Sequence, residues 1–174
     1  FMEGRIQFSA QELTANTVLD TNQLAPTPIH PSIDPFEKLF AGKTILITGG
    51  TGFLGRELTR RLLKYDVQSI RLFSRDEVKH FNTSKQFNNN PKLRHLIGDV
   101  RDYSRLRKAF RGVDIVIHAA ALKRIDIIEY NVEESIQTNV MGSLNVARVA
   151  WDEGVSKALF VSTDKACSPV NTYG

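Results

Sequence analysis

The sequence predicts an α/β fold in which a doubly wound parallel sheet, strand order 3-2-1-4-5, carries helices on both faces. Two observations lead to this prediction. From about residue 41 onward, short apolar runs alternate strictly with longer segments of helical periodicity. The first of these runs passes directly into a glycine-rich turn that opens a helix. Right-handed crossovers between parallel strands then leave few other strand orders.

Five short runs are the expected strands, and they lie at residues 43–48, 69–74, 93–98, 113–121 and 157–162. The first run, KTILIT, is apolar enough to be buried on both faces, as the central strands of parallel sheets are. The fourth run is expected to continue into a loop. Together the runs supply a single parallel sheet.

Helices are expected between the strands at residues 53–66, 102–112 and 131–154. In the first helix the leucines share one stripe, with basic residues opposite. Gly112 and Gly154 are suited to end the other two helices, and Asn131 with Glu134 resembles a capping box. The remaining connection, residues 75–90, is expected to be a broken helix or loop that ends at its asparagines.

Residues 1–40 differ from the rest of the chain and are expected to form a proline-rich arm or linker. The stretch QLAPTPIHPSIDPF contains four prolines and shows neither helical nor strand periodicity. Residues 41–174 then form the one globular domain that a chain of 174 residues accommodates well.

The bulk composition narrows the class of protein. No run approaches the roughly 18 apolar residues of a membrane span, and the N-terminus lacks the pattern of a secretion signal. A single cysteine, Cys167, permits no intramolecular disulfide, and no cluster of metal ligands is evident, so a cytoplasmic protein without a metal is expected. The net charge of +4 is spread over the predicted helices without a nucleic-acid recognition motif. Neither a membrane nor a nucleic acid is therefore an expected partner.

The segment TGGTGFLG, residues 48–55, has the position and composition of a dinucleotide fingerprint. Gly50, Gly52 and Gly55 satisfy G-x-G-x-x-G between a buried strand and a helix. Such a turn lets the backbone approach a pyrophosphate, which meets free amides at the positive end of the helix. The alternative is a turn that serves packing alone. The pattern favours a Rossmann-like fold, with the cofactor held by Gly49, Thr51, Gly52, Phe53, Leu54 and Gly55.

The end of the second strand indicates which dinucleotide is bound. An acidic residue at this point accepts hydrogen bonds from the adenosine ribose of NAD, whereas an arginine accommodates the 2′-phosphate of NADP. Ser74 stands where the acid is expected, and Arg75 follows it. The sequence therefore favours NADP, with NAD as the alternative; Arg75 as an ordinary surface residue remains the competing interpretation.

Two further segments follow the third and fourth strands. In GDVRD, Asp99 and the adjacent Val100 are placed to bind the adenine, although Asp99 could equally cap a helix. In HAAALK, the small residues Ala119, Ala120 and Ala121 would let a cofactor lie against the backbone, although they could equally be core packing. Lys123 of the same loop is a candidate for binding cofactor or substrate.

Together, TGGTGFLG, GDVRD, HAAALK, TNVMGSLNV and the closing STDKA with its P-x-N-x-Y-G resemble the extended short-chain dehydrogenases/reductases. They are most similar to the nucleotide-sugar 4,6-dehydratases, and nearest to the inverting UDP-N-acetylglucosamine 4,6-dehydratases of polysaccharide biosynthesis. STDKA separates this group from simple epimerases and reductases. The resemblance covers residues 40–174. It implies a UDP-sugar substrate, NADP as cofactor and a homo-oligomer.

The resemblance also implies roles for the closing residues. NADP⁺ would take a hydride from C4 of the sugar while Tyr173 removes the hydroxyl proton. Lys165 would then remove the C5 proton, and Asp164 would protonate the hydroxyl that leaves C6, for which Asp164 must be held protonated. Thr163 would hydrogen-bond the substrate near O4. Each side chain also has a structural alternative: a turn residue, a solvated charge or a half-buried aromatic.

The chain departs from the family pattern at its end. The lysine of the Tyr-x-x-x-Lys motif would fall at position 177, and the C-terminal substrate lobe of the relatives is not included. A truncated chain that supplies the cofactor-binding half of the enzyme is therefore expected. Two alternatives remain open: a module that binds NADP(H) without turnover, and a nucleotide-sugar epimerase or reductase.

Overall fold

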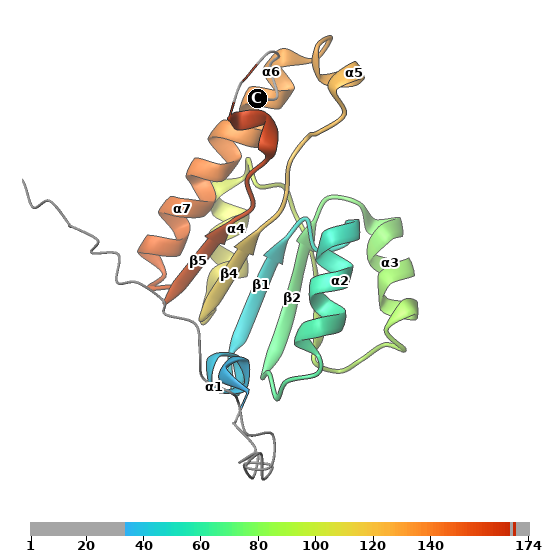
Figure 1. Cartoon of the computed structure of the whole chain (residues 1–174), viewed down its shortest axis with the longest axis vertical. Coiled ribbons are helices and arrows are strands. Elements are labelled where there is room, and N and C mark those ends of the chain that lie inside the picture. The colour runs from blue at the N-terminus through green and yellow to red at the C-terminus, as the bar shows by residue number, and fades with distance from the viewer. Residues whose placement is uncertain (1–33, 168, 170–174) are drawn as a thin grey trace, which may run out of the picture. The chain divides into compact units, whose positions relative to one another are not determined.

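The computed structural model describes residues 34–167 and 169, which contain a five-stranded parallel sheet (Figure 1). Its strands are β1 (Thr44–Thr48), β2 (Ser69–Ser74), β3 (Leu93–Ile97), β4 (Ile115–His118) and β5 (Lys157–Phe160). They are arranged in the order β3-β2-β1-β4-β5, and every neighbouring pair is parallel. The predicted fold class and strand order are confirmed.

Helices cover both faces of the sheet (Figure 1). The helical segments between and after the strands are α2 (Phe53–Leu62), α3 (Glu77–Gln86), α4 (Tyr103–Phe110), α5 (Ile125–Ile128), α6 (Val132–Ser135), α7 (Gly142–Asp152) and the 3₁₀ turn η3 (Asp164–Ala166). A π-helical segment, η2 (Ile136–Met141), joins α6 to α7. Because α6, η2 and α7 follow one another without a break, they form the single long helix expected from the sequence.

Two apolar clusters hold these layers together, and the alternation of side chains along β1 divides them. Ile45 and Ile47 point to the side of α2, where Leu62 closes the cluster. Leu46 points to the other side, where it meets Leu106 of α4 and Val146, Val149 of α7. All five residues of β1 are buried, as predicted for the central strand.

Two details differ from the expected elements, and a third agrees with them. Residues 77–86 form one unbroken helix because the Asp76 carboxylate accepts a hydrogen bond from the backbone N–H of Lys79 and caps it. The asparagines do end it, since Asn88 and Asn89 adopt left-handed backbone angles (φ 52° and 50°). The expected capping box at Asn131 is wrong: its side-chain amide donates to the Ile127 carbonyl of α5 instead.

A short helix, α1 (Pro35–Phe40), lies within the stretch that the sequence analysis assigned to the arm. Asp34 caps it, and proline is well suited to its first turn. Phe40 packs against Tyr65 at the edge of the α2 side of the core. The rest of the expected arm, residues 1–33, lies outside the described residues. Within residues 34–167 and 169, no helix is both long and apolar enough to cross a membrane.

Candidate functional site: a dinucleotide pocket at the carboxyl ends of the strands

A pocket of about 800 Å³ opens where the strands end, the position at which open α/β sheets bind ligands. Its volume falls within the usual range for cofactor sites. Every residue predicted to bind cofactor lines it: Gly49, Thr51, Gly52, Phe53, Leu54, Gly55, Ser74, Arg75, Asp99, Val100, Ala119, Ala120, Ala121 and Lys123. Thr163, the first of the candidate substrate residues, also lies on the wall. The topology thus brings segments that are far apart in sequence into one site.

The glycine turn is shaped by close backbone approaches. Gly49 has φ +67°, and a Cβ there would lie 2.8 Å from the Ala119 carbonyl oxygen. The turn and the HAAALK loop after β4 (the alanine loop) therefore fit together only if residue 49 has no side chain. Gly52 begins α2 with no side-chain cap. The first backbone N–H groups of the helix therefore keep their hydrogen atoms for a ligand at its positive end. This arrangement fits a pyrophosphate.

The end of β2 presents hydroxyl groups and a cation to the pocket. Thr51 Oγ1 and Ser74 Oγ lie 2.7 Å apart, and Arg75 projects beside them. One guanidinium nitrogen of Arg75 is 3.6 Å from the Asp99 carboxylate at the end of β3. The position at which NAD-binding folds usually carry an acid is therefore occupied by Ser74.

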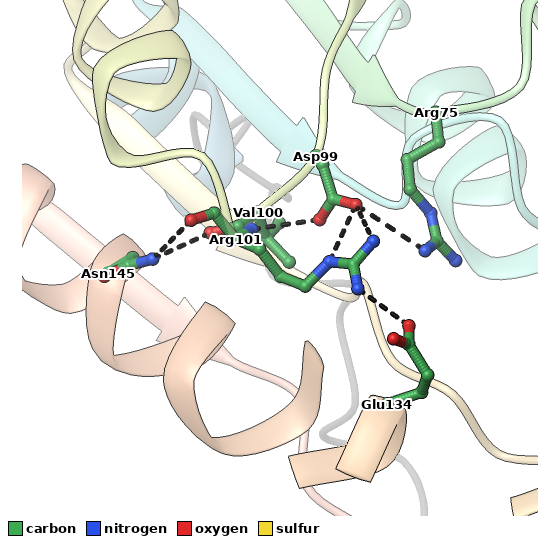
Figure 2. A network of polar contacts seen from close by, with 6 residues as sticks. All are labelled: Arg75, Asp99, Val100, Arg101, Glu134 and Asn145. Carbon is green, nitrogen blue, oxygen red and sulfur yellow. Dashed lines mark hydrogen bonds and ion pairs between the residues drawn. The ribbon is translucent and has the colours of Figure 1, made fainter. Parts of the chain in front are cut away.

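Asp99 lies at the centre of a polar network (Figure 2). It accepts hydrogen bonds from the backbone N–H of Arg101 and from two guanidinium nitrogens of the same residue, at 2.8–2.9 Å. Burial alone would raise the pKa of Asp99, but the bonds and charge of Arg101 outweigh it and hold that pKa below its ordinary value. Arg101 also pairs with Glu134 of α6 at 2.7 Å, so it links the Asp99 side of the pocket to the long helix.

The alanine loop is fixed from below by Thr48. The backbone N–H groups of Ala119 and Ala120 both point at the Thr48 hydroxyl, 3.2 and 3.3 Å away. Further along the loop, the Asn139 amide bonds both the N–H and the carbonyl of Leu122. The pocket wall on this side is therefore a tethered loop.

The end of β5 carries the candidate catalytic residues, but with one departure from expectation. Thr163 and Lys165 both donate to the Asp164 carboxylate, at 3.1 and 3.3 Å. The Thr163 hydroxyl, followed by the Lys165 ammonium, holds the pKa of Asp164 below its ordinary value. In the described residues this exposed carboxyl has donors and no burial to neutralise it, so nothing there holds Asp164 protonated. Asp164 and Lys165 flank the pocket without lining it, and Tyr173 lies outside the described residues.

Sequence reasoning missed the residues that act through tertiary contacts. His80, Arg101 and Ser143 each bond a residue of the pocket wall, and Asn139 tethers the neighbouring Leu122. Three of them had a signal, since Arg101 stands in GDVRD and both Asn139 and Ser143 stand in TNVMGSLNV, whereas His80 lies in no motif.

The strand order, the glycine turn at its switch point and the pocket beside that turn define a protein of the Rossmann-fold class. Within that class, the chain belongs to the polysaccharide biosynthesis protein family, whose model matches residues 45–174. The predicted resemblance to extended short-chain dehydrogenases/reductases of polysaccharide biosynthesis is thereby confirmed.

Curated relatives narrow the likeness further. The chain is 52% identical over 137 residues to a UDP-N-acetylglucosamine 4,6-dehydratase (inverting) of Campylobacter jejuni strain 81-176, covering 78% of the chain and 41% of the relative. It is 46% identical over 140 residues to a UDP-glucose 4-epimerase of Rickettsia massiliae, with the same coverage of 78% and 41%. The chain thus spans about two fifths of the length of these relatives.

Solved structures agree on the fold. Pen from Bacillus thuringiensis is 39% identical and superposes with a TM-score of 0.76, over 78% of this chain and 43% of that one. DesIV, a dTDP-glucose 4,6-dehydratase from Streptomyces venezuelae solved with NAD bound, is 28% identical, with a TM-score of 0.59 over 66% of this chain and 38% of that one.

Proposed function

We propose that this chain is the cofactor-binding part of an NADP-dependent nucleotide-sugar 4,6-dehydratase that acts on UDP-N-acetylglucosamine with inversion at C5. One observation carries the proposal: the pocket that begins at the glycine turn reaches Thr163, so the STDKA segment borders the place where a dinucleotide would lie. The identity of 52% to an inverting dehydratase supports the same reaction.

A nicotinamide cofactor fits the residues present. The free N–H groups of the first turn of α2 suit the pyrophosphate, and the neighbour DesIV binds NAD. When bound, the cofactor would supply hydride transfer from and back to the sugar. Ser74 and Arg75 in place of an acid support NADP over NAD.

The chain's own residues would bind the sugar and move its protons. Thr163 would hydrogen-bond near O4, Lys165 would accept the C5 proton, and Tyr173 would accept the proton of the C4 hydroxyl. Asp164 can act as the acid at O6 only after its pKa rises. A bound sugar would bring this about by burying the carboxyl and separating it from the Thr163 and Lys165 donors. Lys123, which lines the same pocket, would bind an anionic group of substrate or cofactor.

The remaining parts of the proposal rest on the resemblance. The part of the relatives that the chain does not span would hold the nucleotide of the UDP-sugar. A homo-oligomer in the cytoplasm, and an N-terminal arm that ends near residue 40, belong to the same proposal.

A second candidate is a UDP-sugar 4-epimerase, which the 46% identity to the Rickettsia massiliae relative favours. The two reactions share cofactor and first oxidation, and they differ in whether water is lost.

The test has two stages. The chain is first titrated with NADP⁺ and NAD⁺ by calorimetry, and tighter binding of NADP⁺ is expected. A protein in which the chain continues through the full length of its relatives is then incubated with UDP-N-acetylglucosamine, and the products are analysed by mass spectrometry and NMR. Loss of one water supports the dehydratase. An unchanged mass with inverted C4 supports the epimerase, and absence of dinucleotide binding contradicts both.

A further inference from the structure

Two histidines lie behind the pocket in a chain of hydrogen bonds that the proposed reaction does not use. His80 of α3 is only 4% exposed, and its Nε2 lies 3.0 Å from Ser74 Oγ. Its Nδ1 lies 3.1 Å from Nδ1 of His95 on β3. Ser74 in turn bonds Thr51 at 2.7 Å. The chain His95–His80–Ser74–Thr51 therefore runs from the sheet to the pocket wall.

The direction of this chain follows from the carbonyl group of Ser74. Nε2 of His80 also lies 3.2 Å from that carbonyl oxygen, which can only accept a hydrogen bond. A hydrogen atom on Nε2 satisfies both contacts, whereas a bare nitrogen would set two lone pairs against each other. With Nε2 protonated in the neutral ring, Nδ1 of His80 is bare and accepts from Nδ1–H of His95.

The far end of the chain supports the same direction. Nε2 of His95 is buried and has no hydrogen-bond partner among the described residues. In the direction just derived this atom is an unprotonated acceptor. The opposite direction would place an N–H donor there, and an orphaned buried donor is the rarer and costlier arrangement. Burial lowers the pKa of both histidines, which agrees with two neutral rings.

We propose that His80 is a positioning residue that orients the hydroxyl groups of Ser74 and Thr51 as donors toward the pocket and thereby selects a phosphomonoester. Because the Ser74 hydroxyl accepts a hydrogen bond from His80, its own proton can be donated either to Thr51 or to a ligand. If Ser74 donates to Thr51, the Thr51 hydroxyl proton is then free for the ligand. A group with acceptors only, the 2′-phosphate of NADP, matches these donors. The ribose hydroxyls of NAD need an acceptor, which a carboxylate would supply and Ser74 supplies poorly.

Exposed charges near the site cannot orient the hydroxyl protons of Ser74 and Thr51 in place of His80. Arg75 lies toward Asp99 and Lys79 toward Asp76, and both cations are exposed to solvent. Such pairs are weak and screened by salt. They attract an anion, while the buried chain fixes the direction of the hydroxyl protons. The inference rests on the proposed use of NADP and assigns the residue that sets the preference.

The first test needs no cofactor. Long-range ¹H–¹⁵N correlation spectra of the chain at neutral pH report the tautomer of each histidine. His80 is expected with hydrogen on Nε2 and His95 with hydrogen on Nδ1. The reverse tautomers would overturn the inference, whatever the protein binds.

The second test compares variants by calorimetry with NADP⁺ and NAD⁺. The NADP⁺ to NAD⁺ affinity ratio is expected to fall about tenfold in His80→Phe, the size of one hydrogen bond to a charged group. His80→Gln, whose amide can still donate, should restore it. Thr83→Val is the control. Thr83 is buried on the same helix but takes no part in the hydrogen bonds from His95 to Thr51, so the NADP⁺ to NAD⁺ affinity ratio should stay unchanged.

The outcomes distinguish the positioning role of His80 from the proposed use of NADP. An unchanged ratio in a folded His80→Phe variant, checked by circular dichroism, refutes the positioning role and leaves NADP binding intact. If the wild-type protein prefers NAD⁺, or binds neither dinucleotide, the proposed cofactor is refuted. The tautomer spectra then still decide the direction of the hydrogen bonds from His95 to Thr51. If His80→Phe does not fold, His95→Phe replaces it, and the ratio is again expected to fall.

Discussion

The Thr48 hydroxyl donates a hydrogen bond to Nδ1 of His118, 2.6 Å away, between adjacent strands beneath the pocket. Ser143 fixes this direction: its hydroxyl donates to the Asn139 carbonyl at 2.6 Å, so it accepts from Nε2–H of His118 at 2.9 Å. The buried imidazole is therefore neutral, and burial lowers its pKa to about 4. The loop at Ala119 and Ala120 rests on the same Thr48 oxygen.

Acid should destabilise the fold through His118. Its folded pKa of about 4 lies below the ordinary 6.5, so the unfolded chain binds the extra proton first and stability falls as the pH drops from about 6.5 toward 4. Between pH 7.5 and 5 the loss is expected to be about 2 kcal/mol from this group. Urea unfolding at both pH values measures it. His118→Gln should be less stable at pH 7.5 and show a smaller difference between the two; an equal difference contradicts the assignment.

Gly49 and Gly112 offer a matched pair that separates backbone strain from crowding. Both have left-handed angles, φ +67° and +66°, but a Cβ at Gly112 meets nothing within 4 Å, whereas one at Gly49 meets the Ala119 carbonyl at 2.8 Å. Gly112→Ala should cost about 1–2 kcal/mol of unfolding free energy. Gly49→Ala should cost more and should also weaken NADP⁺ binding. If urea unfolding gives both variants the same loss of unfolding free energy, the alanine loop moves aside without a measurable cost.

Arg101 should control the titration of Asp99. Arg101→Met removes the guanidinium bonds and charge and keeps only the backbone N–H of residue 101 and the Arg75 charge against burial, so the pKa of Asp99 should rise. Carboxyl ¹³C shifts followed across pH report this directly. Arg107→Met, which breaks a comparable ion pair with Glu153, is the control and should leave the Asp99 titration in place.

Sequence patterns predicted the sheet and the pocket wall because both depend on local signals. Apolar runs located β1 to β5, and the glycine turn located the pocket, since strand ends of a parallel sheet share one edge. The ionisation of Asp164 could not be predicted in this way. It depends on which donors the fold brings to the carboxylate and on how exposed that group remains. The same holds for His80 and His95, which lie 15 residues apart and meet only after α3 packs on β3.

Lys165 should be needed for dehydration and dispensable for cofactor binding. Its ammonium pairs with Asp164 outside the pocket wall, so Lys165→Ala removes no contact with a dinucleotide. The NADP⁺ affinity of the chain should therefore stay within about twofold of wild type, a change of less than about 0.5 kcal/mol. In the full-length protein the same substitution should abolish loss of water from UDP-N-acetylglucosamine, because Lys165 is the residue proposed to accept the C5 proton. Lys157→Ala, at the start of β5 and outside the pocket lining, is the control and should leave both measurements unchanged. Dehydration that survives Lys165→Ala assigns the C5 base elsewhere, whereas lost NADP⁺ binding shows that Lys165 supports the pocket itself.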